Sequence, residues 1–100
     1  MANHNYFVYI ITNPDKTVLY IGVTNNLQIR LQQHFDNRGD DKTFAGKYCC
    51  FNLMYYERHP YINNAIAREK ELEKWSRVKK EKLITEFNPE WKILNFEIMH

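Results

Sequence analysis

Hydrophobic and polar positions follow two spacings along the chain, and these predict three strands and three helices. Strands are expected where aromatic and β-branched residues run together, and helices where apolar residues recur at three- and four-residue steps. The predicted elements are strands at 6–12 and 18–23, a helix at 26–35, a strand at 48–57, and helices at 62–74 and 76–87. This order predicts an α+β fold with a small three-stranded antiparallel sheet flanked by helices, arranged strand–strand–helix–strand–helix–helix.

The first two predicted strands are separated by Asn-Pro-Asp-Lys, which is typical of a type I turn. We therefore expect a hairpin whose tip is formed by Pro14 and Asp15. That tip places Tyr9 directly opposite Tyr20, with both phenols on one face of the sheet. A cross-strand aromatic pair also forms for packing alone, so the pair by itself favours packing over function.

Capping and turn residues mark the ends of the predicted elements. Thr24 or Asn25 is the expected N-cap of the first helix, and Ser76 that of the last. The charged, glycine-containing segment 36–48 predicts a mobile loop. Residues 88–98 predict an extended or short-strand tail that packs back on the core.

The composition is typical of a globular protein, with 44% hydrophobic and 26% charged residues. We expect one domain over residues 1–100, with a core at about 6–91 and flexible residues at 1–5. A formal net charge of +2 is too small to indicate nucleic-acid binding by itself. No signal peptide or membrane span is predicted, and adjacent Cys49 and Cys50 lack the spacing of a zinc site. We expect reduced cysteines in a buried strand of a cytoplasmic protein.

The first predicted helix carries Arg30 and His34 beside an apolar stripe of Leu27, Leu31 and Phe35. Residues four apart are neighbours on a helix, so the two polar side chains lie together at the rim of the helix–sheet contact. An arginine that covers the core edge and a partly buried histidine with a backbone partner are equally good interpretations.

Glu69 falls near the middle of the apolar stripe of the helix predicted at 62–74. An unpaired buried charge is strongly destabilising, so this carboxylate needs a cation, a metal ion or a cleft. The structural alternative is a salt bridge to an arginine of the same fold. Glu73 shares the edge of the stripe and is the second candidate. The stripe is formed by Ile62, Ala65, Ile66 and Leu72.

Other polar residues give weaker signals, because charge runs usually form a solvated face and only sometimes contact a phosphate backbone. They are Lys47 in the predicted loop, Arg77, Lys79 and Lys80 on the last helix, and Asn88 before a proline.

Taken in order, these residues resemble the GIY-YIG nuclease superfamily. "FVY" at 7–9 and "YIG" at 20–22 resemble its paired signature, "NNLQIRLQQHF" carries the arginine and histidine, and "AREKELEKW" carries the glutamate. "SRVKKEKLI" and "NPEW" look like the ends of small stand-alone members, including those related to the nuclease domain of a bacterial DNA-repair excision protein. The resemblance covers about Tyr6 to Trp91.

The resemblance implies a DNA endonuclease that hydrolyses phosphodiesters with one divalent metal ion, Mg²⁺ or Mn²⁺, held by Glu69. It implies that Tyr9 is the general base, that Tyr20 helps to bracket the attacking water, and that Arg30 clamps a phosphate oxygen. A free phenol titrates near 10, so nearby cations would have to lower its pKa. His34 would share the proton transfer or hold a phosphate oxygen.

The resemblance also implies a group of substrate-binding residues. They are Gly22, which lets the backbone approach the substrate, Asn88, which helps to order the site, and the cations Lys47, Arg77, Lys79 and Lys80. The implied partner is DNA, structured or branched DNA included, with a partner protein as one route to targeting. No membrane association is expected, and the sequence leaves the oligomeric state open.

Two positions depart from the family pattern. Phe7 stands where the signature has glycine, and Val23 stands where some members carry a lysine near the reacting water. Two other functions therefore stay open: a nucleic-acid-binding module of the same fold that does not cut, and an interaction protein whose aromatic pairs serve the core. An intact set of Tyr9, Tyr20, Arg30 and Glu69 favours catalysis.

Overall fold

The computed structural model describes residues 4–98. Within that range the elements are β1 (Tyr6–Thr12), β2 (Leu19–Thr24), α1 (Leu27–Asp36), α2 (Phe44–Lys47), β3 (Asn52–His59), α3 (Ile62–Glu73), α4 (Arg77–Phe87) and α5 (Asn95–Ile98). No helix in the described range is long and apolar enough to cross a membrane.

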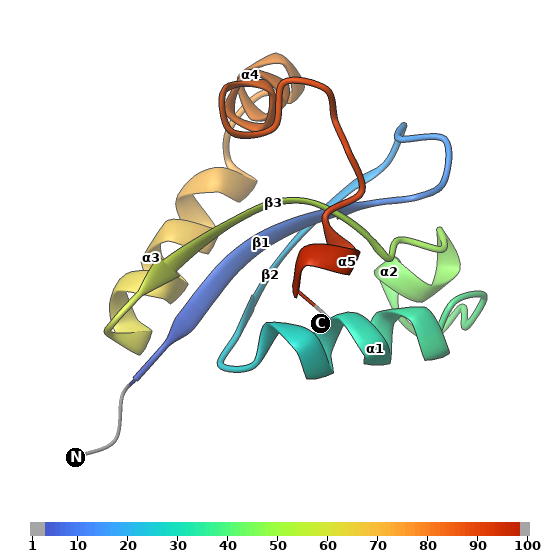
Figure 1. Cartoon of the computed structure of the whole chain (residues 1–100), viewed down its shortest axis with the longest axis horizontal. Helices are drawn as coiled ribbons and strands as arrows, with labels where there is room; N and C mark the ends of the chain where they lie inside the picture. The colour runs from blue at the N-terminus through green and yellow to red at the C-terminus, as the bar shows by residue number, and fades with distance from the viewer. Residues whose placement is uncertain (1–3, 99–100) are drawn as a thin grey trace.

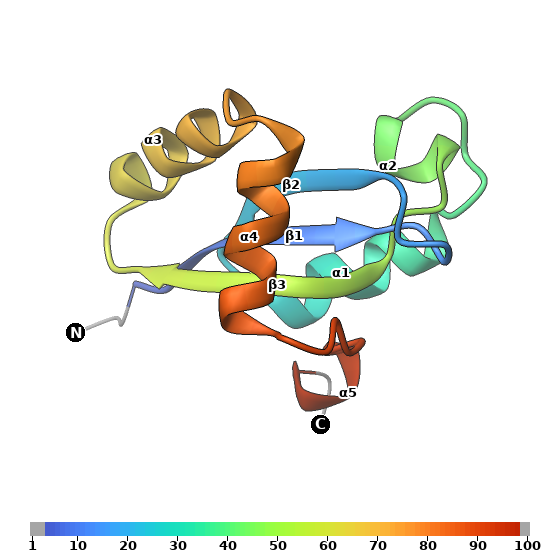
Figure 2. The same ribbon diagram turned by 90° about the horizontal axis from the view of Figure 1, so that it is seen from above.

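The three strands form one antiparallel sheet in the order β2-β1-β3, which confirms the predicted α+β fold. Figure 1 shows α1 and α5 on one face of this sheet, with α3 and α4 on the other. In Figure 2 α4 crosses over the strands, and α3 lies beside α4 with its axis in a different direction.

The central strand β1 is buried on both faces, which explains its nearly continuous apolar sequence. Val8 and Ile10 belong to the hydrophobic cluster under α3 and α4. Tyr9 and Ile11 belong to a second cluster that includes Leu27 and Leu31 of α1. Because alternate residues of a strand point to opposite faces, Tyr9 is directed toward α1.

The third strand begins later than predicted, so the prediction that both cysteines lie in a strand is wrong. β3 starts at Asn52 and continues through His59. Cys49 adopts a positive φ of 56°, and Cys50 is buried. A left-handed residue turns the chain, and extended pairing can begin only after that turn.

The segment predicted as a mobile loop contains the short helix α2. Thr43 caps this helix, because its Oγ1 accepts a hydrogen bond from the Gly46 amide at 3.0 Å. A Cβ on Gly46 would lie 2.4 Å from the carbonyl oxygen of Asp40, so the tight return of the chain admits only glycine. The sequence shows a glycine-containing segment, but not this close approach.

The C-terminal tail packs on the core, as predicted, but it contains the helix α5 in place of a strand. Leu94 is buried, and its amide donates to the Leu53 carbonyl at 2.9 Å. The side chain of Asn95 bonds two more backbone groups of this edge. Its amide nitrogen donates to the Phe51 carbonyl at 2.8 Å, and its oxygen accepts from the Leu53 amide at 2.7 Å. The Asn95 side chain thus supplies hydrogen bonds to the edge of β3 that a further strand would supply. The backbone of the tail can therefore form a helix.

The prediction of flexibility at residues 1–5 concerns mainly residues 1–3, which lie outside the described residues. Asn5 is described, and its side-chain oxygen accepts a hydrogen bond from Arg58 at the far end of β3.

Candidate active site

The two strands of the hairpin pair in a register that is shifted by two residues from the predicted one. Tyr9 lies opposite Gly22, and Tyr20 lies opposite Ile11. A shift of two residues preserves the face of the sheet, whereas a shift of one would reverse it. Tyr9 and Tyr20 therefore share one face, as predicted, but as diagonal neighbours and not as a directly opposed pair.

The register differs because the hairpin loop is longer than its sequence signal indicates. The expected four-residue turn is present, with Lys16 N donating to Asn13 O at 2.9 Å. Asn13 Oδ1 then accepts from the amides of Thr17 and Val18 at 2.8 and 2.9 Å. These bonds hold two further residues in the loop, and β2 starts only at Leu19.

Gly22 makes room for the ring of Tyr9. A Cβ on Gly22 would lie 2.4 Å from Oη and 2.5 Å from Cζ of Tyr9. Among the described residues, Gly39 is the glycine with positive φ, so Gly22 is needed for space and not for a special backbone conformation. The glycine of the motif thus fixes where the Tyr9 phenol lies.

Helix α1 begins one residue later than expected, because Asn26 is the N-cap in place of Thr24 or Asn25. Its Oδ1 accepts from the Ile29 amide at 3.0 Å, while Thr24 Oγ1 accepts from the Asn26 amide at 3.1 Å. The helix therefore starts directly after β2, close to the "YIG" motif at 20–22. Leu27 is buried beneath its first turn.

The first-helix stripe buries Leu31 as predicted, whereas Phe35 is largely exposed against Phe51. Arg30 is exposed and His34 is half-buried. Both line a hollow of about 140 Å³ together with Tyr20. The prediction that these two side chains lie at the rim of the helix–sheet contact is confirmed.

His34 joins the two tyrosines. Its Nε2 lies 2.8 Å from Tyr9 Oη, a hydrogen bond that links α1 to β1. Its ring centroid lies 5.7 Å from that of Tyr9 and 5.6 Å from that of Tyr20. Burial and then the charge of Arg30 lower the pKa of His34 to about 4, so the imidazole is neutral at pH 7.

Glu69 lies on the buried side of α3, between Ala65 and Leu72, and is half-buried. Ile62 and Ile66 of the predicted stripe are instead partly exposed, at 40% and 37%, so the fully buried stripe is narrower than the sequence indicates. The Glu69 carboxylate makes no hydrogen bond or ion pair with any described residue. Burial and then the neighbouring Glu73 raise its pKa, against a lowering by Lys70.

The two phenols respond to both Arg30 and Glu69. Burial raises the pKa of Tyr9, and so do Tyr20 and Glu69, while Arg30 lowers it. Burial and then Glu69 raise the pKa of Tyr20, while Arg30 lowers it. The cation, the carboxylate and the phenols thus form one electrostatic neighbourhood. Arg30 lowers the pKa of both phenols, as expected, but burial outweighs Arg30 in the protein alone, and the expected contribution of a metal ion stays a prediction.

A second hollow of about 290 Å³ adjoins the site on the side of α3 and α4. It is lined by Glu73, Lys80 and Tyr20, and by Phe44 of α2. The Phe44 ring stacks on Tyr20 with a centroid distance of 6.2 Å, and it also lines the first hollow. Sequence reasoning missed Phe44, because the FAGK segment lies in the predicted loop. Thr43, three residues before Gly46, was an available capping signal.

The remaining predicted substrate-binding residues lie in other surroundings. Lys47 lies over Tyr48, with Nζ 5.5 Å from the ring centroid, and Lys79 lies over Trp75 at 4.1 Å. Arg77 donates to the Thr17 carbonyl at 2.5 Å and pairs with Glu81, so it holds the hairpin loop against α4.

Asn88 is buried in the interior. Its amide nitrogen donates to the carbonyls of Met54 and Lys92, and its oxygen accepts from the Lys92 amide. These bonds use the side chain to turn the chain after α4. Lys80 is the cation of the predicted last-helix group that lines a hollow beside Tyr20.

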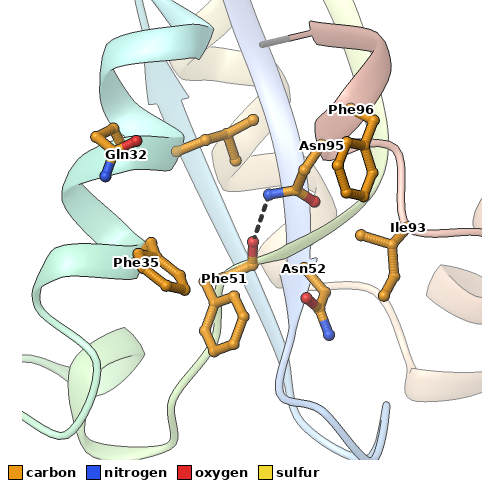
Figure 3. A pocket seen from close by; sticks show the side chains of 8 residues that line it. Gln32, Phe35, Phe51, Asn52, Ile93, Asn95 and Phe96 are labelled. Atoms are coloured by element: carbon orange, nitrogen blue, oxygen red, sulfur yellow. Dashed lines mark hydrogen bonds between the residues drawn. The ribbon is translucent and has the colours of Figure 1, made fainter.

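A larger cavity of about 480 Å³ lies on the flank of α1 opposite to His34. It is formed mainly by apolar side chains of α1, the start of β3 and the C-terminal tail, as Figure 3 shows: Leu31, Gln32, Phe35, Phe51, Asn52, Ile93, Asn95 and Phe96. Charged side chains are missing from this described lining. Size alone would make this cavity the candidate active site. The titratable side chains instead favour the smaller hollows beside Tyr20.

Residues 4–98 contain no cluster of three histidine, cysteine or acidic side chains that could enclose a metal ion. Glu69 acts electrostatically on both phenols and Glu73 on Tyr20, and neither carboxylate has a hydrogen-bond partner in the described chain. One carboxylate suits a hard divalent cation that retains most of its water ligands. The residues present therefore fit a water-rich magnesium or manganese site, and not a zinc site.

Comparisons with known proteins agree with this arrangement. Residues 5–82 match the family model described as the GIY-YIG catalytic domain. A UPF0213 protein of Bacillus pumilus is 33% identical over 90% of this chain and 89% of its own length. A UPF0213 protein of Natronomonas pharaonis is 30% identical over 82% of this chain and 93% of its own length.

The solution NMR structure of a UPF0213 protein from Bacillus halodurans has the same fold. Its TM-score is 0.54 at 28% sequence identity, and the match covers 87% of this chain and 89% of that one. The family model spans both tyrosine strands, α1 and the carboxylate of α3. The chain therefore belongs to the GIY-YIG family of nuclease domains.

Proposed function

We propose that this protein is a metal-dependent endonuclease that hydrolyses phosphodiester bonds in DNA at the surface around Tyr20. One observation supports this function above the others. His34 contacts both Tyr9 and Tyr20, and the two phenols share the electrostatic influence of Arg30 and Glu69. A core-only role for these residues predicts an ion pair between Arg30 and Glu69, and that pair is missing from the described chain.

The Glu69 carboxylate is the ligand we assign to the metal. It is half-buried, unpartnered in the described chain and close enough to Glu73 for its pKa to be raised. A divalent cation such as Mg²⁺ or Mn²⁺, when bound there, supplies positive charge to the phosphate and to the leaving oxygen. The same cation removes the unfavourable burial of an unpaired carboxylate.

Tyr9 and His34 provide a path for the proton of the attacking water. Tyr9 is protonated at pH 7, because burial raises its pKa, so it must lose a proton as it gains one. Its Oη accepts the water proton while its own proton passes to Nε2 of neutral His34, 2.8 Å away. The water oxygen forms the new bond to phosphorus, and the bond from phosphorus to the leaving oxygen breaks.

Arg30 and Lys80 are the cations we assign to the phosphate. Arg30 shares the hollow with Tyr20 and His34, and its planar guanidinium suits two oxygens of one phosphate. Lys80 lines the adjoining hollow and suits a neighbouring phosphate. The low net charge of the chain makes non-specific binding weak, which favours structured DNA or targeting by a partner protein.

The proposal is tested with the full chain and four DNA substrates: plasmid, flap, branched and single-stranded. Cleavage is expected with Mg²⁺ or Mn²⁺ and not with EDTA. Glu69→Gln should abolish it, whereas Glu86→Gln, on the exposed surface of α4, should not. Cleavage by Glu69→Gln at the wild-type rate, or inactivity of the wild type on every substrate, would overturn the proposal.

A thermal-shift measurement separates the enzyme from a binding module that does not cut. Manganese should raise the Tm of the wild type and of Glu86→Gln, because a ligand that binds only the folded state stabilises it. Manganese should leave the Tm of Glu69→Gln unchanged. DNA binding without any metal-dependent shift would support the non-catalytic alternative.

A further inference from the structure

Helix α3 carries Glu69, but its apolar anchoring is thin. Ala65 and Leu72 are its buried residues, whereas Ile62 and Ile66 are 40% and 37% exposed. Its N-cap residue makes no side-chain capping bond, in contrast to the N-caps of α1 and α4. Alanine offers no side chain beyond Cβ to interlock with the sheet, so among the residues that α3 buries Leu72 is the long apolar side chain that resists rotation about the helix axis.

A polar network on β3 adds a second constraint on α3. Glu57 accepts hydrogen bonds from the Tyr55 hydroxyl, from His59 Nε2 at 2.5 Å, and from Arg68 Nε, which lies 3.2 and 3.1 Å from its two oxygens. Burial alone would raise the pKa of Glu57, but the bonds from Tyr55, His59 and Arg68 outweigh it and hold the pKa below its ordinary value. The carboxylate is therefore charged and fixed between two neighbours of its own strand and the helix.

Arg68 is held on more than one side. Its Nη1 lies 2.7 Å from Glu71 on the same helix, and its guanidinium lies 5.2 Å from the ring centroid of Trp75. The contact with Glu57 crosses from α3 to the sheet, where Tyr55 of the same strand also interacts with Arg68. Glu57 is the charged group on β3 that holds Arg68, and it bonds Tyr55 as well, so we expect it to fix how α3 is turned relative to β3.

Arg68 and Glu69 are consecutive, so they project about 100° apart around the helix. Arg68 is fixed to β3 at one edge of the sheet, while Glu69 influences Tyr20 on β2 at the other edge. A rotation of about 20° moves a group about 6 Å from the helix axis by about 2 Å. Displacements of about 1 Å are enough to cost about 100-fold in an active site.

We propose that Glu57 is a positioning residue which, through Arg68, sets the rotation of α3 and thereby directs the Glu69 carboxylate toward Tyr9 and Tyr20. This inference rests on the proposed function, because Glu69 is the metal ligand there. Glu57 itself contacts neither substrate nor metal. Its role differs from that of Glu71, which binds the same arginine but lies on the same helix and cannot orient it.

The test is a manganese titration followed by amide NMR on the full-length protein, in which paramagnetic broadening reports metal bound near Glu69 without any turnover. We expect Glu57→Gln to raise the Mn²⁺ concentration at half-saturation by about tenfold, the usual loss when a supporting residue is removed. Arg68→Lys should do the same, because it keeps the positive charge but loses the planar fork. Glu71→Gln is the matched control and should behave as wild type.

Cleavage kinetics add a second measurement. Glu57→Gln and Arg68→Lys should lower kcat by about tenfold and leave the KM for DNA unchanged, since the DNA-binding cations are untouched. Amide dispersion shows whether each variant is folded. If Glu57→Gln does not fold, Arg68→Lys decides the question.

The outcomes separate this inference from the proposed function. Wild-type Mn²⁺ binding in folded Glu57→Gln and Arg68→Lys, together with lost binding in Glu69→Gln, would overturn the positioning role alone. An equal loss in Glu71→Gln would overturn it too, because a general charge effect would then explain the data. Unchanged broadening in Glu69→Gln would overturn the metal site and the positioning role together.

Discussion

Replacing Gly22 by alanine perturbs the contact on which the geometry of the two tyrosine strands depends. The added Cβ would lie 2.4 Å from Tyr9 Oη, whereas ordinary van der Waals contact begins at 3.4 Å. The phenol must therefore move by about 1 Å. It has little room to do so, because Tyr9 is 1% exposed and hydrogen-bonded to His34.

The expected cost follows from these contacts. Inserting a methyl group into a well-packed core costs about 1–3 kcal/mol. Stretching the Tyr9–His34 hydrogen bond adds about 0.5–1.5 kcal/mol. We expect the free energy of unfolding to fall by about 2–3 kcal/mol, which in a domain of this size lowers Tm by about 10–20 °C. DNA cleavage should fall by about 100-fold, because the proton acceptor is displaced.

Thermal unfolding and cleavage are measured in wild type, Gly22→Ala and a contrasting variant, Gly39→Ala. Gly39 has φ of 89°, and no atom lies within 4 Å of the position that a Cβ would take there. Its replacement costs about 1–2 kcal/mol through backbone conformation and should leave cleavage by the folded protein unchanged. The two glycines thus separate lack of space from backbone strain.

A double mutant identifies the cause of the Gly22 effect. Tyr9→Leu removes Oη and Cζ, so adding Gly22→Ala to it should cost less than about 0.5 kcal/mol. If Gly22→Ala costs as much in the Tyr9→Leu background as in wild type, the steric explanation is refuted. An unchanged Tm and cleavage rate in Gly22→Ala would refute it as well.

Three further predictions concern single side chains. Glu69→Gln should abolish metal-dependent cleavage without lowering Tm at pH 7, because an unpaired half-buried carboxylate whose pKa is raised does not stabilise the fold; a Tm loss above about 5 °C would instead indicate a structural ion pair. The folded-state pKa of His34 is about 4, below the ordinary 6.5, so the unfolded chain takes up its proton first as the pH falls. The free energy of unfolding should therefore decline between about pH 6.5 and pH 4, and denaturant unfolding of His34→Gln should show a shallower decline; an identical decline would contradict the assignment. Thr12→Val should raise the free energy of unfolding by about 1 kcal/mol, since Thr12 Oγ1 is buried without a hydrogen-bond partner among residues 4–98, whereas Thr24→Val removes bonded hydroxyl contacts and should lower it. Equal effects in the two threonine variants would show that the Thr12 hydroxyl is satisfied by water.

Local patterns were enough to predict the elements that the site needs. The β-branched run before Asn13, the Leu27–Leu31 spacing and the Ser76 cap each involve residues a few positions apart, and the structure confirms the elements they indicate. Tyr9 and Tyr20 share a face in any register that differs from the predicted one by an even number of residues. The prediction of a shared face is therefore correct even though the predicted register is wrong by two residues.

Short-range signals failed where a distant contact decided the conformation. Helix α2 depends on Thr43 and on the space that Gly46 leaves for Asp40, and the tail turns into α5 because Asn95 bonds the edge of β3. The start of β3 depends on a left-handed Cys49. Apart from the Thr43 cap, which lies at the usual three-residue spacing, these features have no fixed spacing in the sequence.

The family motifs in the sequence identified the side chains that could carry the chemistry, and strand and helix periodicity indicated the faces on which they lie: Tyr9, Tyr20, Arg30, His34 and Glu69. How these side chains meet depends on the packing of separate elements, which only the tertiary structure decided. It placed His34 between the two phenols, gave Tyr9 the space above Gly22, and brought Phe44 and Lys80 to Tyr20. Periodicity fixes the direction of a side chain within one element, whereas distance, burial and pKa depend on how separate elements pack.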